Sequence, residues 1–464
     1  MLRSVVFLAA GVAAAGAGRP PLVEAAKEGD TATIRALLQK KADVNAMDAD
    51  GTTALHWASY RDDLEAADTF LRAGANVNAA TDLGVTPLWP ASENGSSAMV
   101  RKLLASGANP NLALLSGETP LMVAARGGYA EVVQQLLDKG ANPNARGSRG
   151  QTALMWAVAQ KHPETAKVLI AHRADLNLKS DVWTDVMAIP PHGYLPYNKA
   201  IPHGGETALM FAARVGDLES AKLLAAAGAN VNDADAWGVS AVTLAAHSGF
   251  TDLVGFLLDK GADPNRNECG FTALQEAIMR RDGKMASALL DHGADPNMPL
   301  KTWTPTRRSS DDFNFESQLV GASPYWLAAR FTEPDVMRLL VKHGADPLFV
   351  HHADYVAERG FGGVEQKEMA TPVMAAVGII RAKAWTEIPR AEAESLTLKT
   401  VKLAVELGAD VNVANTDGRT ALDGARTLRY QSVVDFLVEK GAKPGTAGAG
   451  GRGGAGGRGG RGGK

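Results

Sequence analysis

The stretch Gly117–Ala145 reads GETPLMVAARGGYAEVVQQLLDKGANPNA, and it decides the fold. Thr119 is placed to cap the N-terminus of a helix, and Pro120 takes the first helical position, where a missing N–H costs nothing. The pair Gly127-Gly128 then ends the helix. The segment therefore predicts one short helix from Pro120 to the glycine pair.

A second helix follows at once in the same stretch. Its apolar residues stand at helical spacing, and Gly140 ends it because glycine adopts the left-handed conformation that closes a helix. The apolar positions are Val132, Val133, Leu136 and Leu137. A helix pair with apolar residues on both broad faces cannot bury them alone, so it must stack on copies of itself.

Copies of this unit recur along the chain. Each opens with a glycine, a spacer and a threonine or serine, and most neighbouring openings are 32 or 33 residues apart. The openings begin at Gly51, Gly84, Gly117, Gly150, Gly205, Gly238, Gly270, Gly321 and Gly418. Gaps of 55, 51 and 97 residues mark insertions. The period predicts an all-α repeat solenoid.

The two repeated motifs resemble the ankyrin repeat family, whose units open with Gly-x-Thr-Pro-Leu-His and continue with Gly-Ala-Asp-x-Asn. The asparagine of the second motif recurs as Asn45, Asn78, Asn111, Asn144, Asn177, Asn232, Asn265, Asn297 and Asn412. With a first unit from Pro20 and a further one opening at Ala370, about eleven repeats extend to Ala442. The resemblance implies helix-turn-helix units joined by β-hairpin-like loops, and a protein-binding scaffold without enzymatic activity or cofactor.

Several positions depart from the family pattern. The opening histidine occurs only as His56, so the hydrogen bonds that it supplies between repeats are in doubt for most of the array. Lys41 and Arg173 replace the glycine that ends a second helix, at a cost of about 1 kcal/mol each if the left-handed conformation is kept. Leu348 replaces the loop asparagine just before an irregular stretch.

The two ends of the chain differ from the repeats. Residues 1–17 combine Arg3, an apolar run and small residues near Ala15 and Ala17, which is typical of a secretory signal peptide. An uncleaved signal that stays as a tether is the alternative. Residues 443–464 are rich in glycine and arginine without large apolar residues, which predicts a disordered tail.

The charge of the chain is uneven. The formal net charge is −3, and without Arg3 and the five basic residues of the tail the body carries −9. An acidic body disfavours nucleic acid as its main ligand. We therefore expect no specific nucleic-acid binding by the repeats. The Arg-Gly-Gly tail leaves open a contact with nucleic acid or another anionic surface.

Four insertions interrupt the array, near residues 181–203, 299–320, 349–369 and 379–396. The first three lengthen the loop edge and are rich in aromatic residues, which either anchor a partner or cover exposed helix edges. Both interpretations remain open. The fourth predicts a helix extension, a break at Pro389 and an acidic helix start, and is expected at the opposite edge.

The predicted partner-binding residues fall into two groups. Residues that end first helices should line a concave groove, and aromatic residues of the long loops should add specificity. The groove candidates are Tyr60, Arg61, Arg126, Arg214, His247 and Phe331. The loop candidates are Trp183, Tyr194, Tyr197, Trp303, Phe313 and Phe315.

Sequence motifs for catalysis are missing: no nucleophile elbow, zinc-protease helix or phosphate loop occurs. Cys269 is the one cysteine and has no evident histidine partner, so we expect an inert thiol. The pair His351-His352 with Asp354 is the best metal candidate, although adjacent residues of an extended segment point to opposite sides. A metal-dependent or enzyme-associated role for the histidine-containing loops, with His192 and His203, is kept as an alternative.

These observations favour a non-catalytic scaffold that binds a protein partner through its groove and long loops. The signal peptide leads us to expect an exported chain, periplasmic or secreted, of bacterial type. No later segment could span a bilayer, and we expect a monomer. The partner itself cannot be named, because repeat surfaces of this kind have no general recognition code.

Overall fold

The computed structural model describes residues 19–187, 199–304, 315–359, 362–382, 385–386 and 388–446. The predicted signal peptide therefore lies outside the described residues, as do positions 447–464 of the predicted tail. Contacts divide the chain into two compact units. Unit 1 comprises Met1–Val182 and Gly204–Asp235, and unit 2 comprises Trp183–His203 and Ala236–Lys464.

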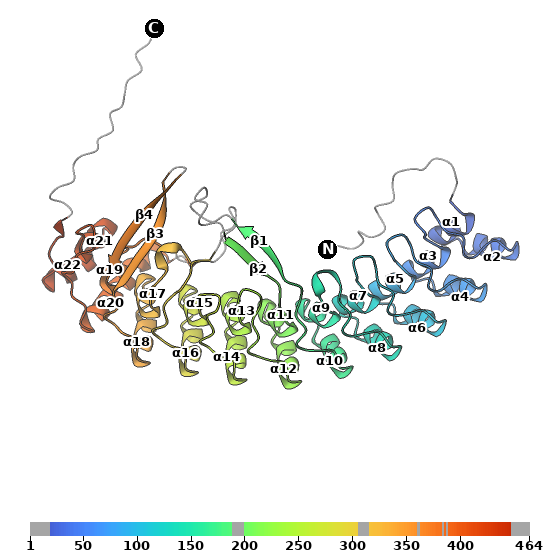
Figure 1. Cartoon of the computed structure of the whole chain (residues 1–464), viewed down its shortest axis with the longest axis horizontal. Coiled ribbons are helices and arrows are strands. Elements are labelled where there is room, and N and C mark those ends of the chain that lie inside the picture. Colours follow the sequence, from blue (N-terminus) through green and yellow to red (C-terminus); the bar gives the residue numbers. More distant parts are fainter. Residues whose placement is uncertain are drawn as a thin grey trace, which may run out of the picture. The chain divides into compact units, whose positions relative to one another are not determined.

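Unit 1 is built from helices that follow one another in pairs (Figure 1). The pairs are α1 (Pro21–Glu28) with α2 (Thr31–Gln39), α3 (Ala54–Tyr60) with α4 (Leu64–Arg72), α5 (Leu88–Glu93) with α6 (Ser97–Ala105), α7 (Pro120–Gly127) with α8 (Ala130–Asp138), α9 (Ala153–Ala159) with α10 (Pro163–Ala171), and α11 (Ala208–Val215) with α12 (Leu218–Ala226). A 3-10 turn, η1 (Ser148–Gly150), precedes α9.

Unit 2 continues the same pattern and adds two hairpins. Its pairs are α13 (Ala241–Ser248) with α14 (Thr251–Asp259), α15 (Ala273–Met279) with α16 (Gly283–Asp291), α17 (Pro324–Arg330) with α18 (Pro334–Lys342), α19 (Pro372–Ala376) with α20 (Arg390–Glu406), and α21 (Ala421–Leu428) with α22 (Gln431–Glu439). The other elements are β1 (Trp183–Met187), β2 (Lys199–His203), η3 (Ser317–Leu319), β3 (His351–Arg359) and β4 (Gly362–Ala370).

The described residues thus contain eleven helix pairs, which confirms the predicted all-α repeat solenoid. Within each unit, first helices pack on first helices, as in α7 on α9 and α15 on α17, and second helices pack on second helices, as in α8 on α10 and α14 on α16. Alanines on the first helices permit this close approach. In α7, Ala124 and Ala125 are completely buried.

The ends of the helices follow the sequence. The Thr119 side chain accepts a hydrogen bond from the Met122 N–H, and Gly128 caps the helix with a φ of 76°. Gly140 has the left-handed φ of 83° that ends α8. Lys41 and Arg173 keep that conformation with a φ of 60° despite their side chains, so the local strain expected from the sequence is present.

An asparagine ladder joins neighbouring repeats along the loops. The Asn111 side chain donates to the Gly140 carbonyl over 2.9 Å and accepts from the Asn142 N–H over 2.8 Å. Asn45 and Asn78 in unit 1 and Asn297 and Asn412 in unit 2 make the same two bonds to the next repeat. In these repeats the motif therefore satisfies the carbonyl of the glycine that follows the second helix of the next repeat. Leu348 lacks the amide and lies beside Gly408.

A second set of bonds is made at the position of the family's opening histidine in two repeats. His56 accepts from the Thr53 N–H at Nδ1 and pairs through Nε2 with the Val85 carbonyl at 2.9 Å, which fixes the tautomer. Gln275 makes equivalent contacts: its Oε1 accepts from the Thr272 N–H, and its Nε2 donates to the Met298 carbonyl. The doubt raised by the sequence therefore does not apply to α15.

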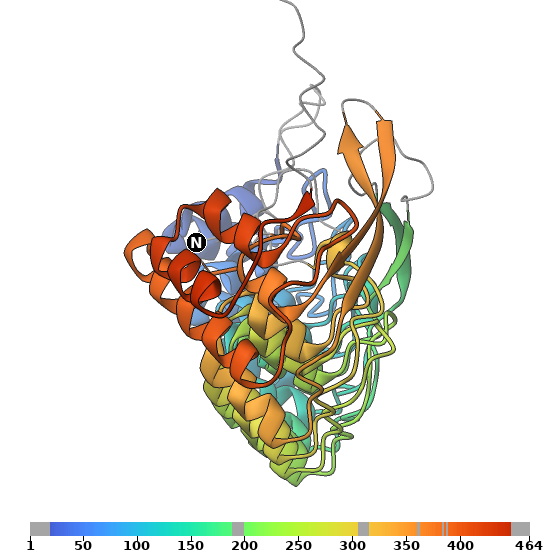
Figure 2. The same ribbon diagram turned by 90° about the vertical axis from the view of Figure 1, so that its left-hand side faces the viewer.

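The first and third insertions fold into antiparallel hairpins rather than irregular loops. In the first, Trp183 pairs with His203, and in the third, His351 pairs with Ala370. Figure 2 shows β3 and β4 running side by side beyond the helices of unit 2. The base of this hairpin is held by the Trp326 Nε1–H, which donates to the Ala370 carbonyl over 2.9 Å.

Two boundary predictions are wrong. The helix extension expected after α19 does not form, since α19 ends at Ala376 and the chain turns at Gly378, whose φ is 73°. The predicted helix start after Pro389 is confirmed, because α20 begins at Arg390. The tail also begins later than predicted: the Lys443 carbonyl accepts from Thr420, and the Gly445 N–H donates to Asp423, so residues 443–446 belong to the last repeat.

Candidate partner-binding face

The face that could bind a partner is defined by two positions of each repeat, six and nine residues after the opening glycine. Residues three apart lie on the same side of a helix, so these two positions share one surface of each first helix. Adjacent repeats bring the positions into contact: the Arg126 guanidinium lies 5.4 Å from the centre of the Trp156 ring. We call this surface the first-helix face.

Unit 1 presents aromatic side chains on its first-helix face. Trp57, Tyr60 and Trp156 are all partly exposed. The Trp57 and Tyr60 rings meet edge to face with their centroids 5.9 Å apart, and the Lys27 ammonium lies 5.7 Å from the Trp57 ring. These contacts fix large rings in place while leaving part of each ring accessible.

Ion pairs hold two arginines on the same face of unit 1. Arg126 donates to Glu118 over 2.9 Å, and Arg214 pairs with Glu206 in the equivalent positions of a later repeat. Burial raises the pKa of Glu206, and the Arg214 charge opposes that shift. Both arginine side chains stay accessible, with 35% and 50% of their surface exposed. The face therefore offers two oriented guanidinium groups, and that of Arg126 lies beside the Trp156 ring.

Arg61 has a structural contact as well. Its Nη1 donates to the Lys27 carbonyl over 3.3 Å, and its guanidinium lies against Gly29, so it joins the ends of two first helices. In the next repeat Asn94 makes a similar bond to the Tyr60 carbonyl over 2.8 Å. Arg61 is exposed and keeps further donors available.

In unit 2 both positions are buried in α15, and the first of them is buried in α17. Six residues after the opening glycine stand Glu276 and Leu327, which are 1% and 0% exposed, and nine residues after it stands Met279, at 1%. Trp57 and Trp156 hold the first of these positions in unit 1 and are partly exposed. Burial at this position also varies within unit 1, where Val123 and Phe211 are 3% and 9% exposed, so it depends on the side chain and its neighbours in each repeat.

Trp385 of the fourth insertion is one of the covering groups. Its ring lies 5.2 Å from the Phe315 ring and 5.9 Å from the His247 ring, measured between centroids. Phe315 in turn lies 5.4 Å from Phe271, and Phe271 lies 5.9 Å from Trp237. The prediction that the fourth insertion lies at the opposite edge is therefore wrong, since Trp385 meets the second insertion at Phe315.

Backbone contacts hold the preceding residues of the fourth insertion. Arg330 Nε donates to the Ile380 carbonyl and Nη2 to the Ala382 carbonyl, each over 2.7 Å. Gln318 Nε2 donates to the Arg381 carbonyl, also over 2.7 Å. Burial lowers the pKa of Arg330 to about 10. Arg330, which stands at a position of the first-helix face, thus donates hydrogen bonds to backbone carbonyls of the same chain.

A buried acid lies beneath this cover. Glu276 Oε2 is 3.1 Å from His247 Nδ1, and Arg280 Nη1 donates to the His247 carbonyl over 2.6 Å. Burial raises the pKa of Glu276, while the His247 contact opposes the shift. Since His247 of α13 packs on Trp385 and pairs with Glu276, it links the fourth insertion to α13 and α15.

The predicted binding residues differ in how exposed the structure leaves them. Tyr60, Arg61, Arg126 and Arg214 lie on the accessible face of unit 1. Phe315 and Phe331 are 1% and 4% exposed and serve packing, so their prediction as partner anchors is wrong for this structure. Trp183 stacks on His203 with centroids 5.7 Å apart, and Trp303 is half-buried. Tyr194, Tyr197 and Phe313 lie outside the described residues.

Sequence reasoning missed the tryptophans of the face. Trp57 and Trp156 share a repeat position, so aligning the units on their opening glycines would have found them. It would also have marked Glu276 as a charged residue where other repeats carry apolar ones. Trp385 could not be found this way, because an insertion has no counterpart in the repeat.

The histidines of the third insertion do not form a metal cluster. His351 is buried, its ring lies 4.5 Å from Trp326, and its Nε2 is 2.9 Å from the Gln318 carbonyl, whereas His352 is exposed on the other side of the strand. Burial lowers the pKa of His351. Across the described residues, no three histidine, cysteine or acidic side chains are grouped to hold a metal ion.

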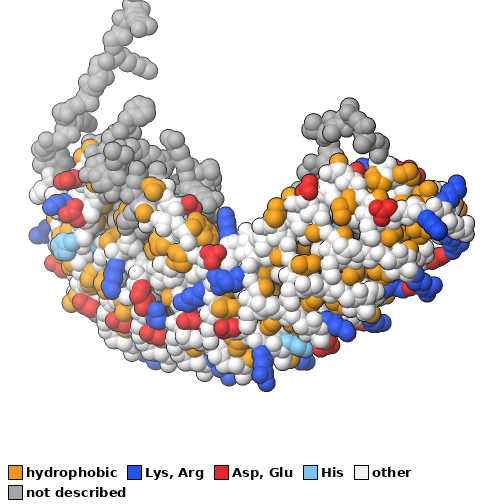
Figure 3. Space-filling view, turned by 45° about the vertical axis from the view of Figure 1, so that its right-hand side comes forward, with side chains coloured by type: hydrophobic (Ala, Val, Ile, Leu, Met, Phe, Trp, Pro, Cys, Tyr) orange, Lys and Arg blue, Asp and Glu red, His pale blue; other side chains and the backbone are white. Residues whose placement is uncertain are grey.

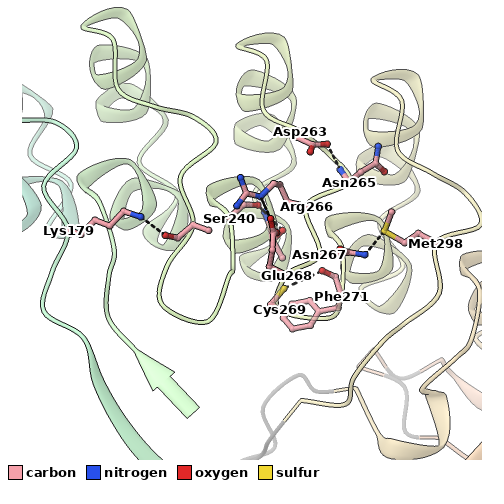
Figure 4. Close-up of polar contacts among 12 residues, drawn as sticks. Lys179, Ser240, Asp263, Asn265, Arg266, Asn267, Glu268, Cys269, Phe271 and Met298 are labelled. Atoms are coloured by element: carbon pink, nitrogen blue, oxygen red, sulfur yellow. Dashed lines mark hydrogen bonds and ion pairs between the residues drawn. The ribbon is translucent and has the colours of Figure 1, made fainter. Parts of the chain in front are cut away.

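Cys269 and its surroundings are part of a loop network (Figure 4). The thiol is 3% exposed and contacts the Phe271 carbonyl at 3.3 Å, and Asn267 reaches Met298 Sδ at 2.8 Å. Burial of the thiol agrees with the predicted inert role.

Charge on the visible face is mixed. Figure 3 shows acidic and basic side chains interspersed, without an extended area of one sign on that face. None of the helices in the described part is long and apolar enough to cross a membrane.

Family models match the chain along its repeats. A model described as ankyrin repeats (3 copies) matches residues 4–81, 22–113, 88–180 and 209–300, and a second, ankyrin repeats (many copies), matches 154–225. The chain belongs to the ankyrin repeat family. Ankyrin repeats generally mediate protein–protein interaction, and proteins built from them are typically non-enzymatic scaffolds. The helix pairs beyond residue 300 extend the array past the matched segments.

A curated relative supports the same assignment. The Ankyrin repeat and KH domain-containing protein CBG24701 of Caenorhabditis briggsae is 30% identical to this ankyrin repeat chain over 240 residues. The match covers 51% of this chain and 8% of that protein. The chain thus spans a small part of this relative's length, and the similarity concerns the repeats.

Proposed function

We propose that this chain is a scaffold that binds a partner protein through the first-helix face of unit 1. The observation that carries the proposal is the group of accessible aromatic and arginine side chains on this face: Trp57 and Trp156 are partly exposed, and Arg126, 35% exposed, lies beside the Trp156 ring. A surface with accessible tryptophan and arginine side chains has the composition of an interaction hot spot.

The chemistry of the face suggests what it recognises. Arg126 and Arg214 are oriented by Glu118 and Glu206 and retain free guanidinium edges, which suit a carboxylate or a backbone carbonyl. The rings of Trp57 and Trp156 add large apolar contact area with little loss of side-chain entropy, because packing already orders them. The favoured partner surface is therefore apolar with acidic groups beside it.

Site-specific cross-linking tests the proposal. A photo-reactive residue placed at Trp57 or Trp156 should cross-link a partner in native extract, whereas the same residue at Leu64 on the second helix α4 should not. With the partner identified, Trp156→Ala should weaken binding about tenfold or more, equal to about 1.4 kcal/mol. Arg126→Ala should also weaken it, with Arg101→Ala, an exposed arginine that pairs with Glu131, as the matched control.

Equal cross-linking from Leu64 and Trp57 would contradict the assignment of the face. So would unchanged affinity in a folded Trp57→Ala, Trp156→Ala double variant. Melting curves by circular dichroism provide the folding control for each variant.

We also propose that the chain is an exported monomer, on the basis of the signal-like residues 1–17. N-terminal sequencing of the protein recovered from a cell envelope or culture fluid tests this proposal. A mature N-terminus between Ala15 and Pro20 would support export, and a chain recovered from the cytosol with Met1 intact would refute it. Light scattering tests the prediction that the chain is a monomer in solution.

A further inference from the structure

Second helices of unit 2 are joined by contacts between an aspartate and a histidine at their C-terminal ends. The helices α14, α16 and α18 pack on one another in that order (Figure 1). His292, the C-cap of α16, places its Nε2 3.1 Å from Oδ1 of Asp259, the last residue of α14. His343 is the C-cap of α18, and its Nε2 lies 3.6 Å from Oδ1 of Asp291, the last residue of α16. One aspartate–histidine contact therefore spans each of these two junctions.

The surroundings of His292 favour its protonated ring. The Nδ1 atom lies 2.7 Å from the Ala288 carbonyl, and the Nε2 atom faces the Asp259 carboxylate, so both partners only accept hydrogen bonds. A neutral imidazole has one N–H and satisfies one of them, whereas an imidazolium donates to both. The C-terminal end of a helix also favours a cation. In agreement, the Ala288 carbonyl and then Asp259 raise the pKa of His292, against a smaller lowering by desolvation.

Other charged groups near this junction leave Asp259 as the counter-ion of His292. Asp291 precedes His292 and raises its pKa further, and on the α18 side His343 pairs with Asp291. The remaining charged groups of the packed elements are Lys260 after α14, which lies 5.8 Å from the Phe256 ring; Glu276 of α15, which pairs with His247; Arg338 of α18, which pairs with Asp335; the exposed Lys342 of α18; and Asp252, in the first turn of α14.

The corresponding junction of unit 1 differs by one side chain. His172 is the C-cap of α10, its Nδ1 also faces a backbone carbonyl, and its Nε2 lies 3.3 Å from Asp138. Here the Gln134 amide nitrogen also lies 3.1 Å from Nε2, so a neutral ring can accept a hydrogen bond from it. Gln134 stands four residues before Asp138. The same position of α14 is Gly255, which has no side chain, so the junction of α14 with α16 depends more on the proton.

We propose that the junction of α14 with α16 is a proton-dependent joint, which tightens when His292 is held as an imidazolium between Asp259 and the end of its own helix. Histidine changes charge in mild acid, and loss of the proton leaves one ring nitrogen facing an acceptor without a hydrogen. Because the folded pKa is raised, this stability is complete below the ordinary value of 6.5 and is lost as the pH rises through the folded value. Burial lowers the pKa of His56 in unit 1, so mild acid weakens the cap of α3 while it strengthens this joint.

Proton NMR of the histidine Hε1 signals in the full chain measures the proton directly. The signal of His292 is the one that disappears in His292→Gln. In the natural chain its midpoint should lie above the ordinary value of 6.5. Asp259→Asn removes the charge and keeps the shape, so it should move the midpoint down. Asp252→Asn, which changes an exposed acid in the first turn of the same helix, is the matched control and should leave the midpoint unchanged.

Hydrogen exchange followed by mass spectrometry measures the joint itself. At about pH 5.5 the amides of α14 and α16 should exchange about threefold more slowly in the natural chain than in Asp259→Asn, and this advantage should disappear at about pH 8. Comparing chains at one pH cancels the intrinsic pH dependence of exchange. Gly255→Gln supplies the amide that unit 1 has, and it should reduce the pH dependence relative to Gly255→Ala. The site has room for both, since no atom lies within 4 Å of a Cβ placed there.

Three outcomes would overturn the inference. The first is a His292 midpoint at or below 6.5, and the second is a midpoint that Asp259→Asn leaves in place. The third is equal exchange of α14 and α16 in the natural chain and in a folded Asp259→Asn variant at about pH 5.5. Circular dichroism provides the folding control. The proposed function can fail separately, because Trp57→Ala and Trp156→Ala change first helices of unit 1 and should leave the titration of His292 unchanged.

Discussion

One residue can decide how a repeat joins the next, and Leu348 is the clearest case. At this position the family motif has an asparagine, and in other repeats that asparagine bonds a glycine carbonyl and an amide of the following repeat, as Asn111 does with Gly140 and Asn142. Leu348 is 52% exposed and lies beside Gly408 without an amide to offer. The junction before α19 and α20 therefore lacks two hydrogen bonds that other junctions have.

Leu348→Asn should therefore stabilise unit 2. The new amide can donate to the Gly408 carbonyl and accept from the Asp410 N–H, and we expect a gain of about 1 kcal/mol in the free energy of unfolding. Chemical denaturation measures it. Leu348→Ala is the control, since it removes the exposed leucine without adding an amide. If the alanine variant is as stable as the asparagine variant, the ladder does not explain the junction.

At the scale of the element, α3 shows how a helix end can depend on pH. The neutral imidazole of His56 accepts the Thr53 N–H at Nδ1 and donates from Nε2 to the Val85 carbonyl, so it caps α3 and joins it to the next repeat. Burial lowers the pKa of His56 to about 4 from its ordinary value of 6.5. The unfolded chain therefore binds a proton more readily than the folded chain does.

The direction of the pH effect on stability follows from this difference in pKa. Stability from His56 is complete above pH 6.5 and is lost as the pH falls toward 4, because the unfolded chain takes up the proton first. A titration of unfolding free energy should show this loss, with a smaller contribution of the same sign from His351. His56→Gln is the control: Gln275 makes the equivalent bonds in α15 and does not titrate. If the variant loses as much stability over this range as the natural chain, the histidine is not responsible.

Elements also show how far the sequence leads. The helix pairs could be predicted because caps, glycines and apolar spacing act within one repeat, as in Thr119, Gly128 and Gly140. The hairpin β3–β4 and the position of Trp385 could not, since both depend on contacts between residues far apart in the chain, such as Trp326 with Ala370 and His247 with Trp385. For the same reason, Phe315 and Phe331 were expected on the surface and are buried.

For the whole molecule, stability is a sum of repeats and the junctions between them. Each helix pair contacts mainly its neighbours, so damage in one pair should spread over a few repeats rather than unfold the entire chain at once. This behaviour distinguishes a repeat array from a globular protein with a single core.

Leu136→Ala tests this expectation. The side chain is fully buried in α8, and its truncation should cost about 2–5 kcal/mol. Hydrogen exchange followed by mass spectrometry should show faster exchange in α7 and α8 and in adjoining repeats, with α17 and α18 unchanged. Leu115→Ala, at a site 79% exposed, should change exchange little. Uniformly faster exchange across all helices would argue for a single cooperative fold.

The asparagine ladder also bears on how such a chain grows. Each rung uses one side-chain donor and one side-chain acceptor, and the groups that it meets on the next repeat are backbone atoms, as at Asn78 with the Gly107 carbonyl and the Asn109 N–H. A duplicated repeat placed between Asn78 and Asn111 would meet the same atoms on both of its sides. Gene duplication can therefore lengthen the array one repeat at a time without inventing a new joint, whereas the junction after Leu348 has no such rung to copy.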